Sequence, residues 1–244
     1  MNRKLAHALY QPYKYLVYLP FLGASTAFFG SGAIVAMEFM DPRKVSDLFG
    51  KWWARVNAMA TPMKVVVEGA ENIKPGVSYV ICSNHQSHFD IFVLYGYLPV
   101  DLRWVMKMEL RKVPFLGAAC EKIGHVYIDR SNREKALASL NEAKERIVNG
   151  TSIIFFPEGT RSEGGTLLPF KKGAFKMALD LSLPILPVTI DGTKNVLPAR
   201  SLDLFPGTAR LKIHPAVETS QYSDETMGEL MDRVRDIIVS GLSD

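Results

Sequence analysis

Residues 79–90 read YVICSNHQSHFD, and residues 152–162 read SIIFFPEGTRS. In each stretch a short apolar run leads directly into polar residues. Apolar runs of this length, bounded by polar or turn residues, are typical of buried strands. The first run is followed by a histidine and, five positions on, an aspartate, and the second by Glu-Gly-Thr-Arg. We therefore expect a sheet whose strands end in functional side chains.

The same pattern continues on both sides of these stretches. Short β-rich runs alternate with helical segments from residue 64 onward, which predicts an α/β domain. We expect a largely parallel or mixed central sheet flanked by helices. The predicted strands are 64–67, 79–83, 102–106, 125–128, 152–156, 185–190 and 209–213.

Two helices are also predicted within this domain. The clearer one covers 132–149, with Ser131 and Glu134 in capping-box relation and Gly150 as its stop. The second covers about 223–241 and closes the chain. The segment 184–188 reads Pro-Ile-Leu-Pro-Val. Because proline cannot donate to a ladder, this segment predicts a core strand at an edge or a bend.

Polar side chains follow four of the predicted strands at the point where each strand ends. In open α/β sheets, ligands bind along the edge formed by the carboxyl ends of the strands. If the strands are parallel, these side chains share one crevice. They are Asn84 and His85, then Lys107, then Asp129 and Arg130, and then Glu158 to Arg161.

His85 and Asp90 suit general base catalysis. A neutral imidazole takes a proton from an attacking hydroxyl, and a carboxylate on its other nitrogen fixes the tautomer and stabilises the imidazolium. The substrate would supply the nucleophile. The alternative is a structural histidine that caps the start of a helix.

His85, His88 and Asp90 also permit a metal site, because imidazole and carboxylate are zinc ligands. The rest of the sequence argues against it, since the remaining histidines are scattered and no cysteine pair supports them. His88 is therefore predicted to be a loop or surface residue.

The second motif suits an anion. Gly159 lets the backbone approach a ligand, Thr160 offers a hydroxyl, and Arg161 presents a guanidinium fork that fits phosphate. Glu158 is predicted to have a structural role or to bind a substrate hydroxyl. Lys107 and Arg130 would complete the site. The alternative for this segment is a tight turn with an exposed arginine.

Composition narrows the class of partner. The chain has 244 residues, 48% of them hydrophobic, and a formal net charge of +4. The basic residues are spread along the chain, which argues against nucleic acid and favours anionic lipid or phosphate. Cys82 and Cys120 show no pairing or metal spacing, which indicates a reducing compartment.

The amino-terminal part, 1–61, is predicted to be a helical membrane anchor, and 62–244 the catalytic domain. Residues 15–37 contain no charged side chain, and this length permits a membrane span without requiring one. Trp52 and Trp53 beside Lys51 and Arg55 favour a helix at the membrane interface. A hairpin inserted in one leaflet is the equal alternative. No small-residue cleavage site follows, so a signal peptide is not expected.

Four blocks in order, 84–90, 107–117 with 124–130, 156–162 and 183–188, resemble the glycerolipid acyltransferases that include bacterial 1-acylglycerol-3-phosphate acyltransferases. The resemblance covers about 65–215. It implies that His85 and Asp90 form the catalytic dyad. It also implies that the acceptor's phosphate and glycerol are bound by Arg130, Glu158, Gly159, Thr160 and Arg161.

The resemblance further implies attack by the sn-2 hydroxyl of lysophosphatidic acid on an acyl thioester of coenzyme A or acyl carrier protein, yielding phosphatidic acid. No metal or redox cofactor is implied. Membrane lipids are expected partners, with the enzyme at the inner membrane and its catalytic domain on the cytoplasmic side. The alternatives are acylation of another lysolipid or of glycerol 3-phosphate, a metal-dependent lipid hydrolase, and a non-catalytic lipid-binding protein.

Overall fold

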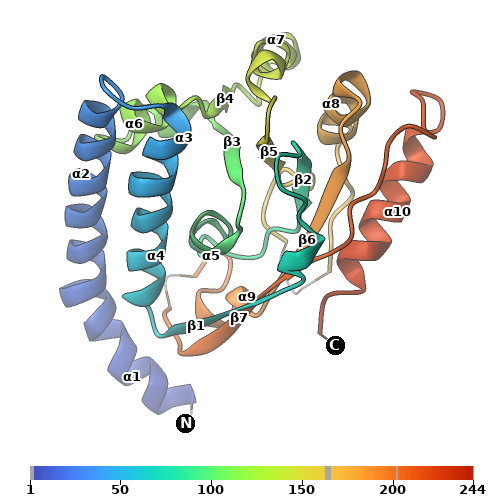
Figure 1. Cartoon of the computed structure of the whole chain (residues 1–244). Helices are drawn as coiled ribbons and strands as arrows, with labels where there is room; N and C mark the ends of the chain where they lie inside the picture. The colour runs from blue at the N-terminus through green and yellow to red at the C-terminus, as the bar shows by residue number, and fades with distance from the viewer. Residues whose placement is uncertain (1–2, 163–165, 202, 244) are drawn as a thin grey trace.

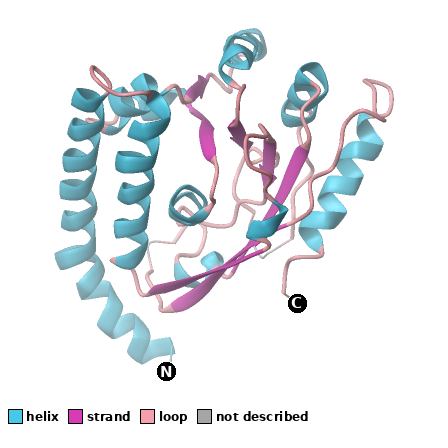
Figure 2. Cartoon of the chain, in the orientation of Figure 1, coloured by secondary structure: helices cyan, strands magenta, loops and turns pink. Residues whose placement is uncertain are grey.

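The computed structural model of the chain describes residues 3–162, 166–201 and 203–243, and within them a seven-stranded sheet has helices on both faces (Figures 1 and 2). The strand order is β1-β7-β6-β2-β5-β3-β4. Neighbours are parallel throughout, except that β6 and β7 are antiparallel. The predicted mixed α/β fold is therefore confirmed. The strands are β1 (Met63–Glu68), β2 (Val80–Ser83), β3 (Asp101–Lys107), β4 (Val126–Ile128), β5 (Thr151–Phe155), β6 (Ile185–Asp191) and β7 (Gly207–Ile213).

The sheet separates two hydrophobic cores, because successive side chains of a strand point to opposite faces. Ile81 and Ile154 belong to one core, whereas Cys82 and Ile153 belong to the other. The first core is covered by α5 (Asp90–Tyr97) and the amino-terminal helices, the second by α7 (Arg133–Ala143), α8 (Gly173–Leu181) and α10 (Met227–Val239). Two shorter helices, α6 (Leu116–Ile123) and α9 (Thr193–Val196), lie in the connections. Strands buried on both faces explain the continuous apolar runs in the sequence.

The amino-terminal helices form a hairpin. One arm comprises α1 (Arg3–Tyr13), a π-helical turn (Lys14–Tyr18) and α2 (Leu19–Ala36). The other comprises α3 (Pro42–Val45), a second π-helical turn (Ser46–Lys51) and α4 (Trp52–Met59). Figure 1 shows α2 and α4 side by side, with α5 between α4 and the sheet. The hairpin is thus the outermost layer on one face of the molecule.

This hairpin is bound to the α/β part along its length. Gln11 donates to the Leu204 carbonyl at 3.1 Å, and Nε2 of His7 lies 3.3 Å from the Asp203 carboxylate. Gly50 lies so close to α5 that a Cβ there would collide with the hydroxyl of Tyr95. The α/β organisation begins at β1, and the division into two domains stays a prediction. Both parts contribute to one core.

The prediction that Pro187 restricts its strand to an edge or a bend was wrong. β6 is an interior strand, paired with β2 on one side and β7 on the other. The antiparallel ladder with β7 begins at Val188, and the Pro187 carbonyl accepts the His214 N–H at 3.0 Å. Pro187, which has no N–H to donate, therefore lies at the end of that ladder.

Three details of the predicted helices were also wrong. α7 ends at Ala143 and continues only as a 3₁₀ turn, Lys144–Arg146. Its amino-terminal cap is Asn132, whose side chain accepts the Lys135 N–H at 3.0 Å, and not Ser131. α10 begins at Met227, later than expected.

Candidate active site

His85 and Asp90 are in direct contact. His85 lies in the loop after β2, and its Nδ1 is 2.8 Å from Oδ2 of Asp90, the first residue of α5. The same oxygen accepts the N–H groups of Gln86 at 2.7 Å and Ser87 at 2.9 Å. The carboxylate is fully buried. An acceptor at Nδ1 places the proton there and leaves Nε2 as the free base.

The other oxygen of Asp90 has its own donor. Thr193, the first residue of α9, donates its hydroxyl to Oδ1 at 2.5 Å. The chain segment before it is fixed by Asn84, whose side-chain amide exchanges two 2.8 Å hydrogen bonds with the backbone of Ile190 in β6. Both oxygens of the dyad carboxylate are therefore held by buried groups.

Phe156 sets the plane of the imidazole. It directly follows β5, and its ring stacks on that of His85 with centroids 3.9 Å apart and planes 10° apart. Trp104 in β3 packs behind Phe156 at 5.8 Å between centroids. With Asp90 holding one edge and Phe156 one face, the His85 ring has a single orientation.

Glu158 joins the two motifs. Its Oε1 accepts the N–H of His85 at 2.9 Å, and its Oε2 accepts the N–H of Leu168 at 2.8 Å. The carbonyl of His85 in turn accepts the Ser162 N–H at 2.8 Å. Burial raises the pKa of Glu158. Of the two predicted roles, this geometry supports the structural one, and a direct contact with substrate stays a prediction.

Gly159 is required for the shape of the second motif. Its φ of 73° lies in the left-handed region, and a Cβ there would be 2.6 Å from Nζ of Lys171. The carbonyl of Gly159 accepts a hydrogen bond from Arg130 at 2.6 Å. This bond links the segment after β4 to the segment after β5.

The groups expected along one sheet edge do converge. A cavity of about 430 Å³ is bordered by the dyad histidine and by five residues predicted to bind substrate. These five are Lys107, Arg130, Gly159, Thr160 and Arg161. They lie at or after the carboxyl ends of β3, β4 and β5, which are neighbouring parallel strands. Asp129 is not among them, because its carboxylate accepts the N–H and the hydroxyl of Ser131 instead.

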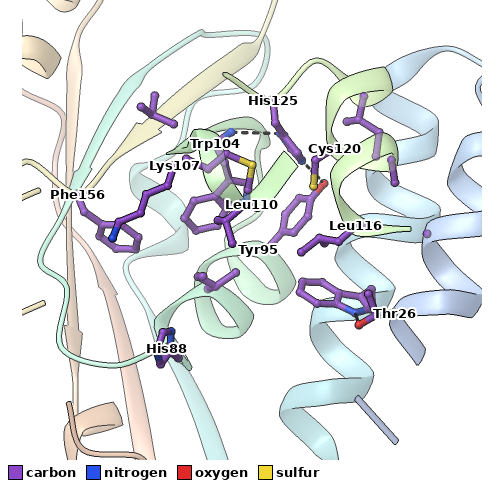
Figure 3. Close-up of a pocket in the computed structure, with 18 of the residues that line it drawn as sticks. Thr26, His88, Tyr95, Trp104, Lys107, Leu110, Leu116, Cys120, His125 and Phe156 are labelled. Carbon is purple, nitrogen blue, oxygen red and sulfur yellow. Dashed lines mark hydrogen bonds between the residues drawn. The ribbon is translucent and has the colours of Figure 1, made fainter. Parts of the chain in front are cut away.

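The interior of this cavity is apolar and extends toward the helical hairpin (Figure 3). Phe29, Trp53 and Leu116 border it, and Figure 3 shows Tyr95 and His125 on the side away from His88. The cavity is therefore polar where it meets the carboxyl ends of the strands and apolar where it meets the hairpin. The apolar part is called the apolar chamber.

His125 forms a buried polar group in that chamber. Its Nδ1 accepts the Trp104 backbone N–H at 3.2 Å, so its Nε2 donates to the Tyr95 hydroxyl, also at 3.2 Å. The Tyr95 hydroxyl is 3.0 Å from the Ser46 hydroxyl on the hairpin. Burial, followed by the Arg103 charge, lowers the pKa of His125 to about 3. The ring is neutral at neutral pH and acts as a fixed hydrogen-bonding group.

His88 was predicted as a loop or surface residue, and it is an exposed loop residue that also borders the cavity. Burial of part of the ring and the Arg161 charge lower the pKa of His88. A metal site at these histidines gains no support, since the Asp90 oxygens are taken by donors. Within the described residues no three His, Cys, Asp or Glu side chains are grouped to hold a metal ion.

Comparison with known proteins identifies the family. The profile of the family described as Acyltransferase matches residues 64–191. The 1-acyl-sn-glycerol-3-phosphate acyltransferase of Saccharomyces cerevisiae is 31% identical over 91% of this chain and 74% of its own length. The chain belongs to this acyltransferase family. The resemblance inferred from the four sequence blocks is thereby confirmed.

Two further relatives extend the comparison. The acyltransferase is 32% identical to human 1-acyl-sn-glycerol-3-phosphate acyltransferase alpha over 71% of this chain, and it spans 62% of the human protein. The crystal structure of the 1-acyl-sn-glycerophosphate (LPA) acyltransferase PlsC from Thermotoga maritima is similar in fold, with a TM-score of 0.80 and 31% identity. That match covers 98% of this chain and 96% of the other, so it includes the amino-terminal hairpin.

Sequence reasoning missed two residues that position the dyad of the acyltransferase. Phe156 could have been predicted, since an aromatic residue at the end of a strand can stack on a histidine that follows the neighbouring strand. Thr193 carried no local signal, because its partner Asp90 is 103 positions away in the chain.

Proposed function

We propose that this acyltransferase transfers a fatty acyl group from an acyl thioester to the sn-2 hydroxyl of lysophosphatidic acid, giving phosphatidic acid. Coenzyme A or acyl carrier protein would carry the donor acyl group. The observation that carries the proposal is the placement of an oriented histidine base in the same cavity as Lys107, Arg130 and Arg161. The names of the curated relatives point to the same acceptor.

The dyad geometry supports a direct transfer. Nε2 of His85 takes the proton of the acceptor hydroxyl as its oxygen attacks the thioester carbonyl carbon. The resulting imidazolium is stabilised by Asp90 through Nδ1–H. The carbon–sulfur bond then breaks, and the thiolate receives the proton from Nε2. The step as written balances without a metal or redox cofactor.

The cations give the acceptor its orientation. A phosphate dianion matches Arg161 and Lys107, and a guanidinium binds two phosphate oxygens at once. Arg130 is committed in part to the Gly159 carbonyl and holds the loop that carries Arg161. Anchoring the phosphate at a fixed distance from His85 selects one glycerol hydroxyl for deprotonation.

The apolar chamber suits an acyl chain. Its walls combine hairpin residues such as Phe29 and Trp53 with sheet residues such as Trp104. Each methylene removed from water contributes about 0.8 kcal/mol. A long chain bound there would therefore hold its thioester beside His85 for the duration of the transfer.

The hairpin supports residence at a membrane. Residues Leu5–Ala36 form a helix whose most apolar 18-residue window has a mean hydropathy of 1.5, and only 22% of that window is buried. Leu16 is 77% exposed and Phe28 is 70% exposed. Because the same helix is held to the α/β part by the Gln11 hydrogen bond to Leu204 and by the packing of α2 on α6, we favour a hairpin inserted in one leaflet over a span. We place the enzyme at the cytoplasmic face of the inner membrane, where both free cysteines stay reduced.

The test is an acylation assay on the purified protein in detergent, with acyl-coenzyme A and acyl carrier protein donors against a panel of lysolipids and glycerol 3-phosphate. We expect lysophosphatidic acid to be the best acceptor. His85→Ala should abolish acylation while the thermal unfolding profile is retained. A better rate with another acceptor would replace the proposed substrate, and near-normal turnover by His85→Ala would remove the dyad.

A further inference from the structure

A second apolar compartment lies beside the catalytic cavity. This groove, of about 660 Å³, runs between the helical hairpin and the segment 113–116. Leu19, Leu22 and Gly23 line it from α2, and Phe89 and Phe92 line it from the α5 side. The proposed transfer places the donor acyl chain in the catalytic cavity and assigns no group to this groove.

The groove meets the catalytic cavity at a shared wall. Thr26, Trp53 and His88 border both compartments. Trp53 donates its indole N–H to the Thr26 hydroxyl at 3.0 Å, which fixes the wall between α4 and α2. His88 lies in the same loop as His85, so both compartments reach the neighbourhood of the base.

The groove also opens on the apolar surface of the hairpin. Three of its lining residues are well exposed, namely Leu19 at 44%, Val113 at 37% and Phe115 at 48%. If the hairpin lies in a leaflet, as proposed, these residues face lipid. A molecule resident in the bilayer would enter the groove without crossing water.

One polar atom in the groove lacks a partner. Tyr18 lines the groove and is 3% exposed, and its hydroxyl has no hydrogen-bond partner in the described part of the chain. A buried hydroxyl left without a partner costs about 1–3 kcal/mol. Its ring packs edge to face on Phe89, which directly precedes the dyad aspartate. An oxygen of a bound ligand would supply the missing acceptor.

We propose that this groove binds the acyl chain that the acceptor lysolipid already carries, and that the Tyr18 hydroxyl donates to an ester oxygen of that lipid. The assignment rests on the proposed function, in which two acyl chains must be present at once. The donor chain occupies the cavity beyond His85, and the acceptor chain approaches from the lipid side. The cavity and the groove therefore meet near His85, where the acyl group would pass from the thioester to the acceptor hydroxyl.

Gly23 allows a direct test. Gly23 lines the groove and a Cβ there meets nothing within 4 Å, so Gly23→Leu adds an apolar side chain at the groove wall from an open position. Gly228 in α10 is equally open and lies outside the groove, so Gly228→Leu is the matched control. The readouts are kcat/KM for 1-oleoyl and 1-hexanoyl glycerol 3-phosphate, and the donor chain-length profile at a fixed acceptor.

We expect Gly23→Leu to lower kcat/KM for the 1-oleoyl acceptor by roughly tenfold or more, the discrimination that small steric changes give in apolar pockets. For Gly23→Leu, the kcat/KM for the 1-hexanoyl acceptor and the relative rates with donors of different chain length should stay within about twofold of the wild type. All of these values for Gly228→Leu should also stay within about twofold of the wild type. Tyr18→Phe should raise the KM of the 1-oleoyl acceptor by about 2- to 10-fold, the effect of one hydrogen bond.

An unchanged acceptor KM in both Gly23→Leu and Tyr18→Phe would overturn the groove assignment, and so would a shifted donor profile. These outcomes leave the proposed function standing. A wild-type protein that acylates no lysolipid would instead overturn the proposed function itself, and the groove assignment with it.

Discussion

Thr193 and Asp90 are joined by a buried hydrogen bond of 2.5 Å from the threonine hydroxyl to Oδ1 of the carboxylate. The other carboxylate oxygen is the one that contacts His85. Rotation of the carboxylate would break bonds at both oxygens at once. The dyad is therefore oriented from β6 and α9 as well as from its own loop.

Thr193→Val should act on turnover and not on substrate binding. Valine keeps the shape of threonine but removes the donor, and a hydrogen bond to a charged group is typically worth about 1.5–3 kcal/mol. We expect kcat to fall by about 10- to 100-fold with KM nearly unchanged. Thr193→Ser restores a hydroxyl and should recover most of kcat. A loss of thermal stability with normal kcat would show that the hydroxyl serves folding alone.

Arg161→Ala should weaken binding of the phosphorylated acceptor. Loss of a charge-assisted, forked contact predicts a rise in acceptor KM of about 10- to 100-fold, with a smaller change in kcat. Arg210→Ala, at an exposed position of β7 remote from the cavity, is the matched control. Steady-state kinetics with varied lysophosphatidic acid measure the effect. Equal KM values for the two variants would remove Arg161 from the anion site.

Glu158→Gln should destabilise the junction of the two motifs. The carboxylate accepts two backbone N–H groups, and an amide offers only one acceptor oxygen to them. We expect a loss of about 1–3 kcal/mol in the free energy of unfolding, with reduced kcat. The free energy of unfolding is measured by denaturant titration in detergent. The control is Glu229→Gln, which changes an exposed glutamate of α10. Normal stability with a raised acceptor KM would favour direct contact with substrate.

His125 should make the protein less stable in mild acid. Its pKa in the folded protein is about 3, below its ordinary value of 6.5. Between these values the unfolded chain binds a proton that the folded chain does not, so the free energy of unfolding falls as the pH is lowered. Above about pH 6.5 this contribution is fully present.

The slope expected from this single group is on the order of 1.4 kcal/mol per pH unit. We would measure the free energy of unfolding of the wild type and of His125→Gln at several pH values from neutral to mildly acidic. The difference between the two slopes is the contribution of His125. The two proteins should differ in slope below about pH 6. Parallel curves would show that His125 is not held neutral by its burial.

The position of the site was predictable because its signals are local. Each predicted site residue lies at or just after the end of a strand, and parallel pairing of β2, β5, β3 and β4 then brings the strand ends together. A structural role for Glu158 was one of the two predicted, but its partner was not predictable, because the N–H of His85 is 73 positions away. The place of Pro187 depends on where β7 ends, which only the assembled sheet determines.

The contribution of the hairpin to the cavity was likewise hidden. An uncharged segment with glycines predicts membrane affinity, but it does not indicate which residues face the protein. Gly50 reads as a helix-weakening residue until α5 is placed beside it, where only a hydrogen fits against Tyr95. Contacts between elements, and not the pattern within one element, decide such positions.

The hairpin, described above as the outer layer of the fold, supplies Phe29 and Trp53 to the wall of the catalytic cavity. Replacing it with an unrelated apolar hairpin would leave one side of this cavity without its wall. Swapping anchors between relatives should therefore fail unless the facing residues of α5 and α6 are exchanged with them. Under the proposed function, the residues that attach the protein to the membrane and the residues that shape the acyl-chain cavity therefore belong to the same hairpin.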